Sequence, residues 1–211
     1  MPLFKTITLP DGLIGVWQLT ETSDEFIYDF SPEELANSVF QQYTYEKRKV
    51  EWLVIRILIK LLIGPDFTLS YSETRKPILH HHQFRHISIS HSRDFLTVFI
   101  HKHQQVGIDI ESISRNYDPI MKRYLSDLEL IQVGKNPVLK CLYWCAKEAI
   151  FKLVPDEGIE FRTQIHVSPF NPDHDDHFSA RFISGEMVSS FRLNFQVFAG
   201  HGMVWVAEEN S

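Results

Sequence analysis

Residues 46–63, EKRKVEWLVIRILIKLLI, form the segment that most restricts the folds open to this chain. The segment is apolar on nearly every side, and a Gly-Pro pair directly after it predicts the end of a helix. A helix of that kind lies in a protein core or crosses a membrane. Its most apolar part is too short to cross a bilayer and carries Glu51, Arg56 and Lys60. We therefore expect a helix buried at the centre of a globular fold.

A second helix is expected over residues 138–154, where apolar side chains recur at spacings of three or four. Ser31, followed by Pro32 and Glu34, predicts the start of an earlier helix. Short helical patches are expected within residues 112–136. Alternating patterns predict strands over residues 14–20, 67–72, 86–90, 95–100, 106–111, 161–167, 178–183, 192–198 and 203–207. The predicted class is α+β.

Each half of the chain contains a buried helix followed by antiparallel strands, with a boundary near residues 101–105. This order indicates a weak internal repeat, although the halves share no recognisable sequence identity. A length of 211 residues allows one domain or two small ones. The net charge of −6 argues against a general nucleic-acid binder. Cys141 and Cys145 are expected to be buried and reduced. Because the N-terminus lacks the pattern of a signal peptide, we expect a cytoplasmic protein.

Carboxylates interrupt two of the expected elements. Asp109 and Glu111 lie two apart on a strand, so their side chains share one face. Glu148 and Lys152 lie four apart on the second helix and share one stripe. Alone, the first pair is typical of a solvated edge and the second of a surface ion pair. Together, the three carboxylates form an all-oxygen set of the kind that magnesium favours.

The same residues lie in two motifs, VGIDIE (106–111) and WCAKEAIFK (144–152). These motifs resemble the paired signature of the 4′-phosphopantetheinyl transferases. Upstream, KRKVEWLVIRILIKLL resembles the family's basic-then-apolar helix, RKPIL its Lys-Pro loop and SISHS its Ser-His-Ser strand end. The blocks follow the family's order over residues 47–152, and the length suits the long, pseudo-dimeric class of the surfactin-synthetase-activating kind. One departure is Arg75, where the family's loop often has glycine.

The resemblance implies a fold of two similar halves related by a pseudo-two-fold axis. Each half would pack a long helix on a small antiparallel sheet. Residues 1–104 would hold the coenzyme A nucleotide, and residues 105–211 the metal and catalytic groups. The site would occupy the cleft between the halves of one chain, so a monomer is expected.

The resemblance further implies transfer of 4′-phosphopantetheine from coenzyme A to a serine of an acyl or peptidyl carrier protein, with release of adenosine 3′,5′-bisphosphate. Mg²⁺, with Mn²⁺ as a substitute, would bind Asp109, Glu111 and Glu148. Lys152 would stabilise or protonate the departing phosphate oxygen. Glu148 would be the general base for the serine hydroxyl or a metal ligand; it cannot easily be both, and the sequence leaves its main role open.

The coenzyme A contacts that the resemblance implies come from both halves. They are Arg48, Arg56, Arg75, Lys76, Pro77, Ser90, His91, Asp109 and Lys152. An alternative for Arg56 is an ion pair with Glu51 or another acid. An acidic carrier protein would need a local basic surface, and the segment Met121, Lys122, Arg123, Tyr124 and Leu125 combines charge with apolar contact. A solvated helix face is the other interpretation of that segment.

Two rival functions fit part of the pattern. A magnesium-dependent nucleotide phosphohydrolase would use the carboxylates to activate water. An inactive relative would bind coenzyme A without catalysis, although a simple binder needs neither Glu148 nor Lys152. The natural carrier protein and its pathway are not encoded in these motifs.

Overall fold

The computed structural model describes residues 3–154 and 158–208, and it confirms the α+β class. The N-terminal sheet has the strand order β1 (Leu3–Thr8), β2 (Gly12–Gln18), β6 (Phe95–His101), β5 (His86–His91). The C-terminal sheet has the order β7 (Val106–Ser112), β11 (His201–Ala207), β10 (Met187–Phe198), β9 (His177–Ser184), β8 (Ile165–Val167). A separate hairpin pairs β3 (Thr68–Tyr71) with β4 (Pro77–His80). Every strand pair is antiparallel.

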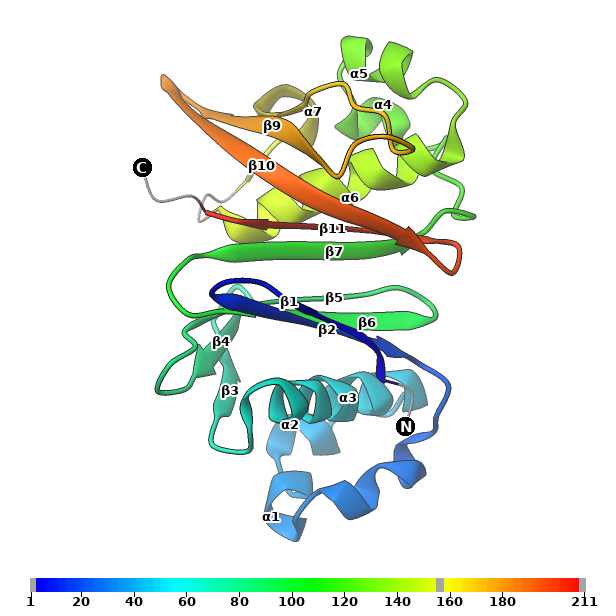
Figure 1. Ribbon diagram of the computed structural model, residues 1–211. Coiled ribbons are helices and arrows are strands. Elements are labelled where there is room, and N and C mark those ends of the chain that lie inside the picture. The colour runs from blue at the N-terminus through cyan, green and yellow to red at the C-terminus, as the bar shows by residue number, and fades with distance from the viewer. Residues whose placement is uncertain (1–2, 155–157, 209–211) are drawn as a thin grey trace.

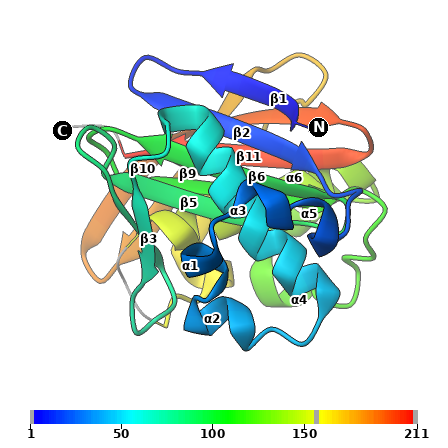
Figure 2. The same cartoon turned by 90° about the horizontal axis from the view of Figure 1, so that it is seen from below.

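Two long helices, α3 (Glu46–Ile63) and α6 (Pro137–Leu153), enclose the sheets from opposite sides. Figure 1 shows four layers in the order α3, N-terminal sheet, C-terminal sheet and α6. Seen from below, α3 lies over the strands of the N-terminal sheet (Figure 2). Leu53, Leu58 and Ile59 of α3 are fully buried, as expected for a helix that is apolar on nearly every side. Each sheet therefore packs one face against its own long helix.

The remaining helices are short. They are η1 (Ser23–Glu25), η2 (Ile27–Asp29), α1 (Pro32–Leu35), α2 (Ser38–Gln41), α4 (Met121–Tyr124), α5 (Asp127–Val133) and α7 (Phe161–Gln164). Ser31 caps α1 as expected, but Asn37 caps a new helix and divides the segment into α1 and α2. In the described part of the chain, no helix has the length and apolarity that a membrane crossing requires. Cys141 and Cys145 are buried and free, which confirms that expectation.

The strand expected over residues 161–167 is wrong in its first part, because α7 forms there before β8. The backbone carbonyls of Phe161 and Ile165 both accept from the fully buried amine of Lys147, at 2.9 and 2.6 Å. A helical turn brings these carbonyls to one point, which an extended strand does not do. The strands β1 and β4 were not expected from the sequence.

The two sheets meet through the edge strands β5 and β7. Ser88 and Ser90 of β5 accept hydrogen bonds from the backbone N–H groups of Ile108 and Ile110, at 3.1 and 3.4 Å. Side-chain hydroxyls thus accept from backbone N–H groups at the edge of β7 that would otherwise be buried without hydrogen-bond partners. Apolar side chains of β7, including Val106, fill the core between the sheets. This junction fixes β7 at the centre of the molecule.

Gly107 allows α6 to approach β7 closely. A Cβ atom built on Gly107 would lie 1.8 Å from the carbonyl oxygen of Ala149, a separation that no side chain tolerates. The missing side chain therefore sets the distance between helix and strand. Because Ala149 lies next to Glu148 on α6, this contact brings the helix carboxylate toward Asp109 and Glu111 of β7.

Candidate functional site

Three cavities adjoin one another around Ile89 of β5, which lines all of them. The carboxylate pocket, about 290 Å³, is lined by Ile89, Ser90, His91, Asp109, Glu111, Trp144, Glu148 and Lys152. The lysine pocket, about 710 Å³, includes Arg75, Lys76, Pro77, Ser88, Gln105 and Lys152 in its lining. The arginine pocket, about 580 Å³, includes Tyr43, Arg48, Glu51, Tyr71, Arg75 and His91. Both halves of the chain supply walls.

Asp109 is the centre of the carboxylate pocket and is only 5% exposed. Its Oδ1 accepts from the Lys152 amine at 2.7 Å and from the Ser90 hydroxyl at 2.6 Å. The Lys152 amine also donates to the carbonyl oxygen of Ile108 at 2.9 Å. Oδ2 of Asp109 is buried without a hydrogen-bond partner among the described residues. One oxygen of Asp109 is thus fixed, and the other remains available to a ligand.

Glu148 lies on α6, one turn before Lys152, and lines the same pocket. Burial raises the pKa of Glu148 to about 7, and the negative charges of Asp109 and Glu111 add to that rise, while Lys152 opposes it. Among the described residues, no ion pair joins Glu148 to Lys152. The ion pair suggested by the helical spacing is therefore wrong, because Lys152 reaches across to Asp109 on β7 instead.

Glu111 pairs with the guanidinium of Arg115, which follows β7 in a loop. Burial raises the pKa of Glu111, and the charge of Asp109 adds to the effect, whereas Arg115 lowers it. The Arg115 guanidinium also lies 5.0 Å from the ring centroid of Trp144, which lines the pocket. Arg115 was not expected from the sequence to lie at the site. Its position four residues after Glu111 was the only signal, and outside a helix that spacing predicts no contact.

The carboxylate pocket has donors of the chemical kind that a divalent cation prefers, but the described residues do not assemble them into a metal site. Three carboxylates share one small cavity, and Oδ2 of Asp109 lacks a partner among the residues described. Hard cations such as Mg²⁺ take carboxylate oxygens of this kind and complete their shell with water or phosphate. However, within the described ranges no group of three His, Cys, Asp or Glu side chains is assembled closely enough to hold a metal ion. Lys152 and Arg115 neutralise two of the carboxylates instead.

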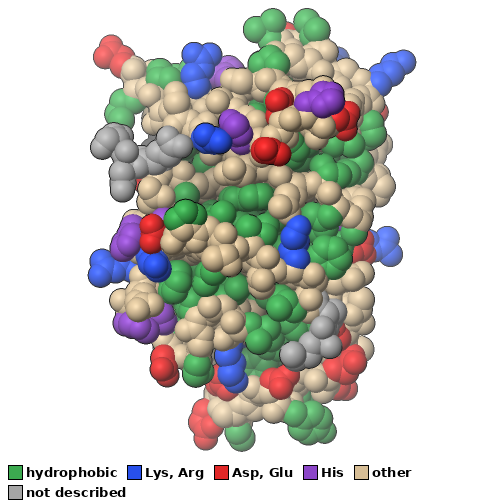
Figure 3. All heavy atoms as spheres, in the orientation of Figure 1, with side chains coloured by type: hydrophobic (Ala, Val, Ile, Leu, Met, Phe, Trp, Pro, Cys, Tyr) green, Lys and Arg blue, Asp and Glu red, His purple; other side chains and the backbone are tan. Residues whose placement is uncertain are grey.

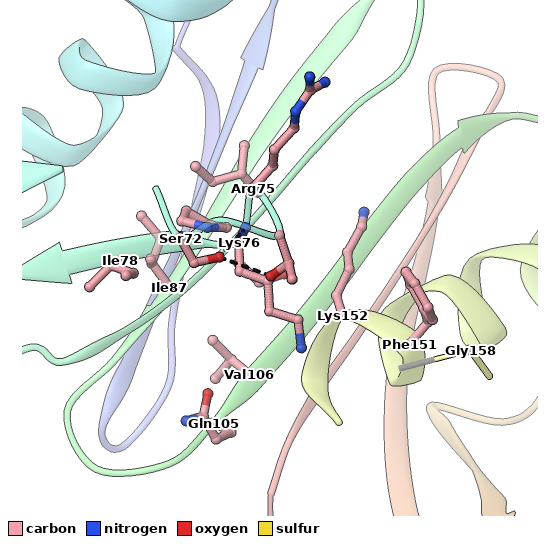
Figure 4. Close-up of a pocket in the computed structure, with 14 residues that line it drawn as sticks. Ser72, Arg75, Lys76, Ile78, Ile87, Gln105, Val106, Phe151, Lys152 and Gly158 are labelled. Atoms are coloured by element: carbon pink, nitrogen blue, oxygen red, sulfur yellow. Dashed lines mark hydrogen bonds between the residues drawn. The ribbon is translucent and has the colours of Figure 1, made fainter. Parts of the chain in front are cut away.

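The lysine pocket lies between the β3–β4 loop and the end of α6 (Figure 4). The Lys76 amine donates to the carbonyl oxygen of Val154 at 2.8 Å, which links the two halves across the pocket. Figure 4 shows the side chains of Arg75 and Lys76 leaving the loop in different directions. Arg75 has a φ of 63°, in the left-handed region that favours glycine. Glycine would adopt this backbone conformation with less strain than arginine does.

In the arginine pocket, Arg48 holds Glu51 at 2.9 Å, so the alternative pairing of Arg56 with Glu51 is wrong. Arg56 instead stacks on Trp52, with its guanidinium carbon 3.4 Å from the ring centroid, and donates to the Trp52 carbonyl at 3.1 Å. Burial lowers the pKa of Arg56 to about 10. Burial also lowers the pKa of His91, with Glu51 opposing this effect.

Ten of the predicted site residues line at least one cavity, and Arg56 lines none of the three. The ten are Arg48, Arg75, Lys76, Pro77, Ser90, His91, Asp109, Glu111, Glu148 and Lys152. Their individual roles remain predictions. The predicted carrier surface needs a correction, because Met121, Tyr124 and Leu125 are at most 8% exposed and pack in the C-terminal core. Only Lys122 and Arg123 of that segment face solvent.

Residues 105–201 match a family model, ACPS, described as the 4′-phosphopantetheinyl transferase superfamily. The matched segment contains β7 and α6, so it supplies Asp109, Glu111, Glu148 and Lys152. No curated protein matches the chain.

Proposed function

Since the chain belongs to the 4′-phosphopantetheinyl transferase superfamily, we propose that it transfers 4′-phosphopantetheine from coenzyme A to a serine of an acyl or peptidyl carrier protein. The second product is adenosine 3′,5′-bisphosphate. Superfamily membership supports phosphopantetheine transfer in general. The observation that carries the finer proposal is the carboxylate pocket, where Asp109, Glu111 and Glu148 lie beside the amine of Lys152.

Mg²⁺, or Mn²⁺ in its place, is the proposed metal, with Asp109, Glu111 and Glu148 as its ligands. When bound, it would offset the negative charge of the coenzyme A pyrophosphate. The unpartnered Oδ2 of Asp109 supports this assignment.

The chain's own residues supply the proton transfers. The serine oxygen attacks the phosphorus next to the pantetheine, and the bond from that phosphorus to the bridging oxygen breaks. Glu148 takes the serine proton, directly or through a water, and its pKa of about 7 suits a base near neutral pH. Lys152 donates a hydrogen bond to the leaving phosphate oxygen from its place beside Asp109.

The nucleotide of coenzyme A is proposed to bind the N-terminal half, residues 1–104. Arg75 and Lys76 in the lysine pocket, and Arg48 and His91 in the arginine pocket, are the cationic groups for its phosphates. Residues 105–211 contribute the three carboxylates, Asp109, Glu111 and Glu148, together with Lys152. We propose that the protein acts as a monomer, because residues from both halves of the chain line the carboxylate pocket and the lysine pocket.

We predict that kcat/KM falls as the pH drops below about 7. This prediction holds if Glu148 acts as the base rather than as a metal ligand. A base works only when ionised, and the raised pKa of Glu148 places its protonation near neutrality, whereas a bound cation would lower that pKa. The same shift makes the folded protein hold this proton more tightly than the unfolded chain does, so Glu148 favours folding at low pH. That contribution is lost as the pH rises through the interval from 4.5 to about 7.

The rate should be measured against pH for the wild type and for Glu148→Gln, whose residual activity should lack this titration. A flat wild-type profile between about pH 5.5 and 8 contradicts the assignment.

Recognition of an acidic carrier protein gives a second prediction. Lys122 and Arg123 are exposed, and on nearby α5 the apolar side chains of Leu128 and Ile131 are 72% and 78% exposed. Figure 3 shows apolar side chains at the upper tip of the molecule, where α5 lies. The double change Lys122→Glu and Arg123→Glu should raise the KM for the carrier and flatten its salt dependence, since rim charges steer association.

The control for this prediction is the KM for coenzyme A, which should not change. Lys135→Glu is a matched variant, because Lys135 is exposed in the same half but lies outside the segment. An unchanged carrier KM at low salt removes Lys122 and Arg123 from the interface.

The proposed function itself is tested by mass spectrometry of an apo carrier protein incubated with coenzyme A, Mg²⁺ and this protein. A gain of the phosphopantetheine mass on the carrier is the expected result. Cleavage of coenzyme A without modification of the carrier supports the phosphohydrolase instead. If neither change occurs, although coenzyme A binds, the inactive relative is supported.

A further inference from the structure

Glu51 is a buried acid in the wall of a pocket whose other charged groups are basic. Its side chain is 6% exposed, whereas Arg48 and Lys47 beside it are 58% and 54% exposed. Glu51 lines the arginine pocket together with Arg48, Arg75 and His91. Such an arrangement is unusual for a pocket that accepts phosphate, because a buried carboxylate repels an anion.

The contacts of Glu51 show which basic side chains it interacts with. Its Oε2 accepts from Arg48 at 2.9 Å. Its Oε1 lies 3.4 Å from Nδ1 of His91 and 3.9 Å from the Lys47 amine. Yet Oε1 is buried without a hydrogen bond to any described residue. The carboxylate is therefore incompletely satisfied, although three basic side chains surround it.

We propose that Glu51 is a specificity-determining residue that competes with a phosphate monoester for Arg48 and His91. This inference rests on the proposed function, which assigns Arg48 and His91 to the nucleotide phosphates. A phosphate entering the arginine pocket must displace the carboxylate from these side chains or bind beside it against like-charge repulsion. In coenzyme A the phosphate monoester is the 3′-phosphate. Under this proposal the 3′-phosphate adds little binding free energy, so the pocket discriminates poorly against dephospho-coenzyme A, which lacks only that group.

A structural role for Glu51 makes the opposite prediction. If the carboxylate only holds Arg48 and His91 in position for the phosphate, its loss weakens coenzyme A binding. The sign of the change in affinity thus separates the two roles.

Isothermal titration calorimetry of the wild type, Glu51→Gln and Asp66→Asn tests the proposal with coenzyme A, dephospho-coenzyme A and inorganic phosphate. Asp66→Asn is the matched control, because it removes one negative charge at an exposed position outside the three cavities. Glu51→Gln should bind coenzyme A and inorganic phosphate about tenfold more tightly, since one charge-assisted hydrogen bond is worth roughly that factor. The affinity for dephospho-coenzyme A should not change, and Asp66→Asn should behave as the wild type.

The wild type alone provides a second measurement if Glu51→Gln does not fold. Its affinities for coenzyme A and dephospho-coenzyme A should differ by less than about tenfold. A preference for coenzyme A of about a hundredfold or more overturns the proposal, as does an unchanged or weaker affinity of Glu51→Gln for coenzyme A. If no variant binds either coenzyme but Glu51→Gln gains affinity for inorganic phosphate, the proposed function fails and the role of Glu51 stands. If no variant binds any probe, both fail.

Discussion

Asp109→Ala is expected to abolish phosphopantetheine transfer while coenzyme A binding stays measurable. The substitution removes the carboxylate that holds the Lys152 amine at 2.7 Å and that offers its second oxygen to a cation. The groups proposed for the nucleotide outside the carboxylate pocket, such as Lys76 and Arg48, keep their own contacts. Turnover, measured by the mass that the carrier protein gains, should therefore be lost. Coenzyme A binding, measured by calorimetry, should be retained.

Asp109→Asn is the matched variant, because it keeps the shape and an acceptor for Ser90 but removes the charge. It should lose nearly as much turnover as Asp109→Ala. The alanine variant should also lose about 1–3 kcal/mol of unfolding free energy, since the buried Ser90 hydroxyl loses its acceptor. Turnover of either variant near the wild-type rate in Mg²⁺ means that the metal site is misplaced.

Lys152→Ala is expected to lower turnover by about a hundredfold or more. A lysine that meets charge developing on the leaving phosphate contributes roughly 2.7–4 kcal/mol to the transition state, as other single electrostatic donors do. If Lys152 serves only in an ion pair with Asp109, its loss leaves a buried carboxylate without its cation, which costs about 3–5 kcal/mol of stability but little activity. Single-turnover rates and thermal unfolding together distinguish these cases. Lys135→Ala, at an exposed position, is the control and should change neither quantity.

Glu148→Gln should be the more damaging change, because it removes a base and a metal ligand while keeping the shape of the side chain. Raised Mg²⁺ should partly rescue this variant if ligation is the main role of Glu148, and should not if the carboxylate is the base. Lys152→Ala should not respond to Mg²⁺ in either case. The proposed roles fail if both variants stay folded and keep more than about half of the wild-type turnover.

The local elements were predictable because their signals lie in neighbouring residues. The apolar run of α3, with its Gly-Pro end, predicted Glu46–Ile63 correctly, and the alternating pattern predicted β7. Elements with weak local signals were missed, among them β1 and the turn of α7. Phe161 and Ile165 lie in a helical turn because their carbonyls meet the buried amine of Lys147, a partner distant in sequence.

The candidate residues of the carboxylate pocket could also be selected from the sequence, since two motifs contain Asp109, Glu111, Glu148 and Lys152, which line one cavity. Which of these groups contact one another was not. The helical spacing suggested that Lys152 pairs with Glu148. Instead, α6 approaches β7 closely at Gly107, and the Lys152 amine forms a hydrogen bond with Asp109, 43 residues away. In the same way, Glu51 pairs with Arg48 and approaches His91 rather than pairing with Arg56.

Sequence by itself determined the types of the elements with strong periodicity, the candidate residues for the chemistry and the family that their motifs resemble. Only the tertiary structure decided which charges are paired, which are buried and which face solvent. Met121, Tyr124 and Leu125 show the difference, because their segment has a mixed surface pattern but lies in the C-terminal core except for its two basic residues. The physical reason is that periodicity is a property of adjacent residues, whereas desolvation and ion pairing depend on groups that meet only when distant segments pack.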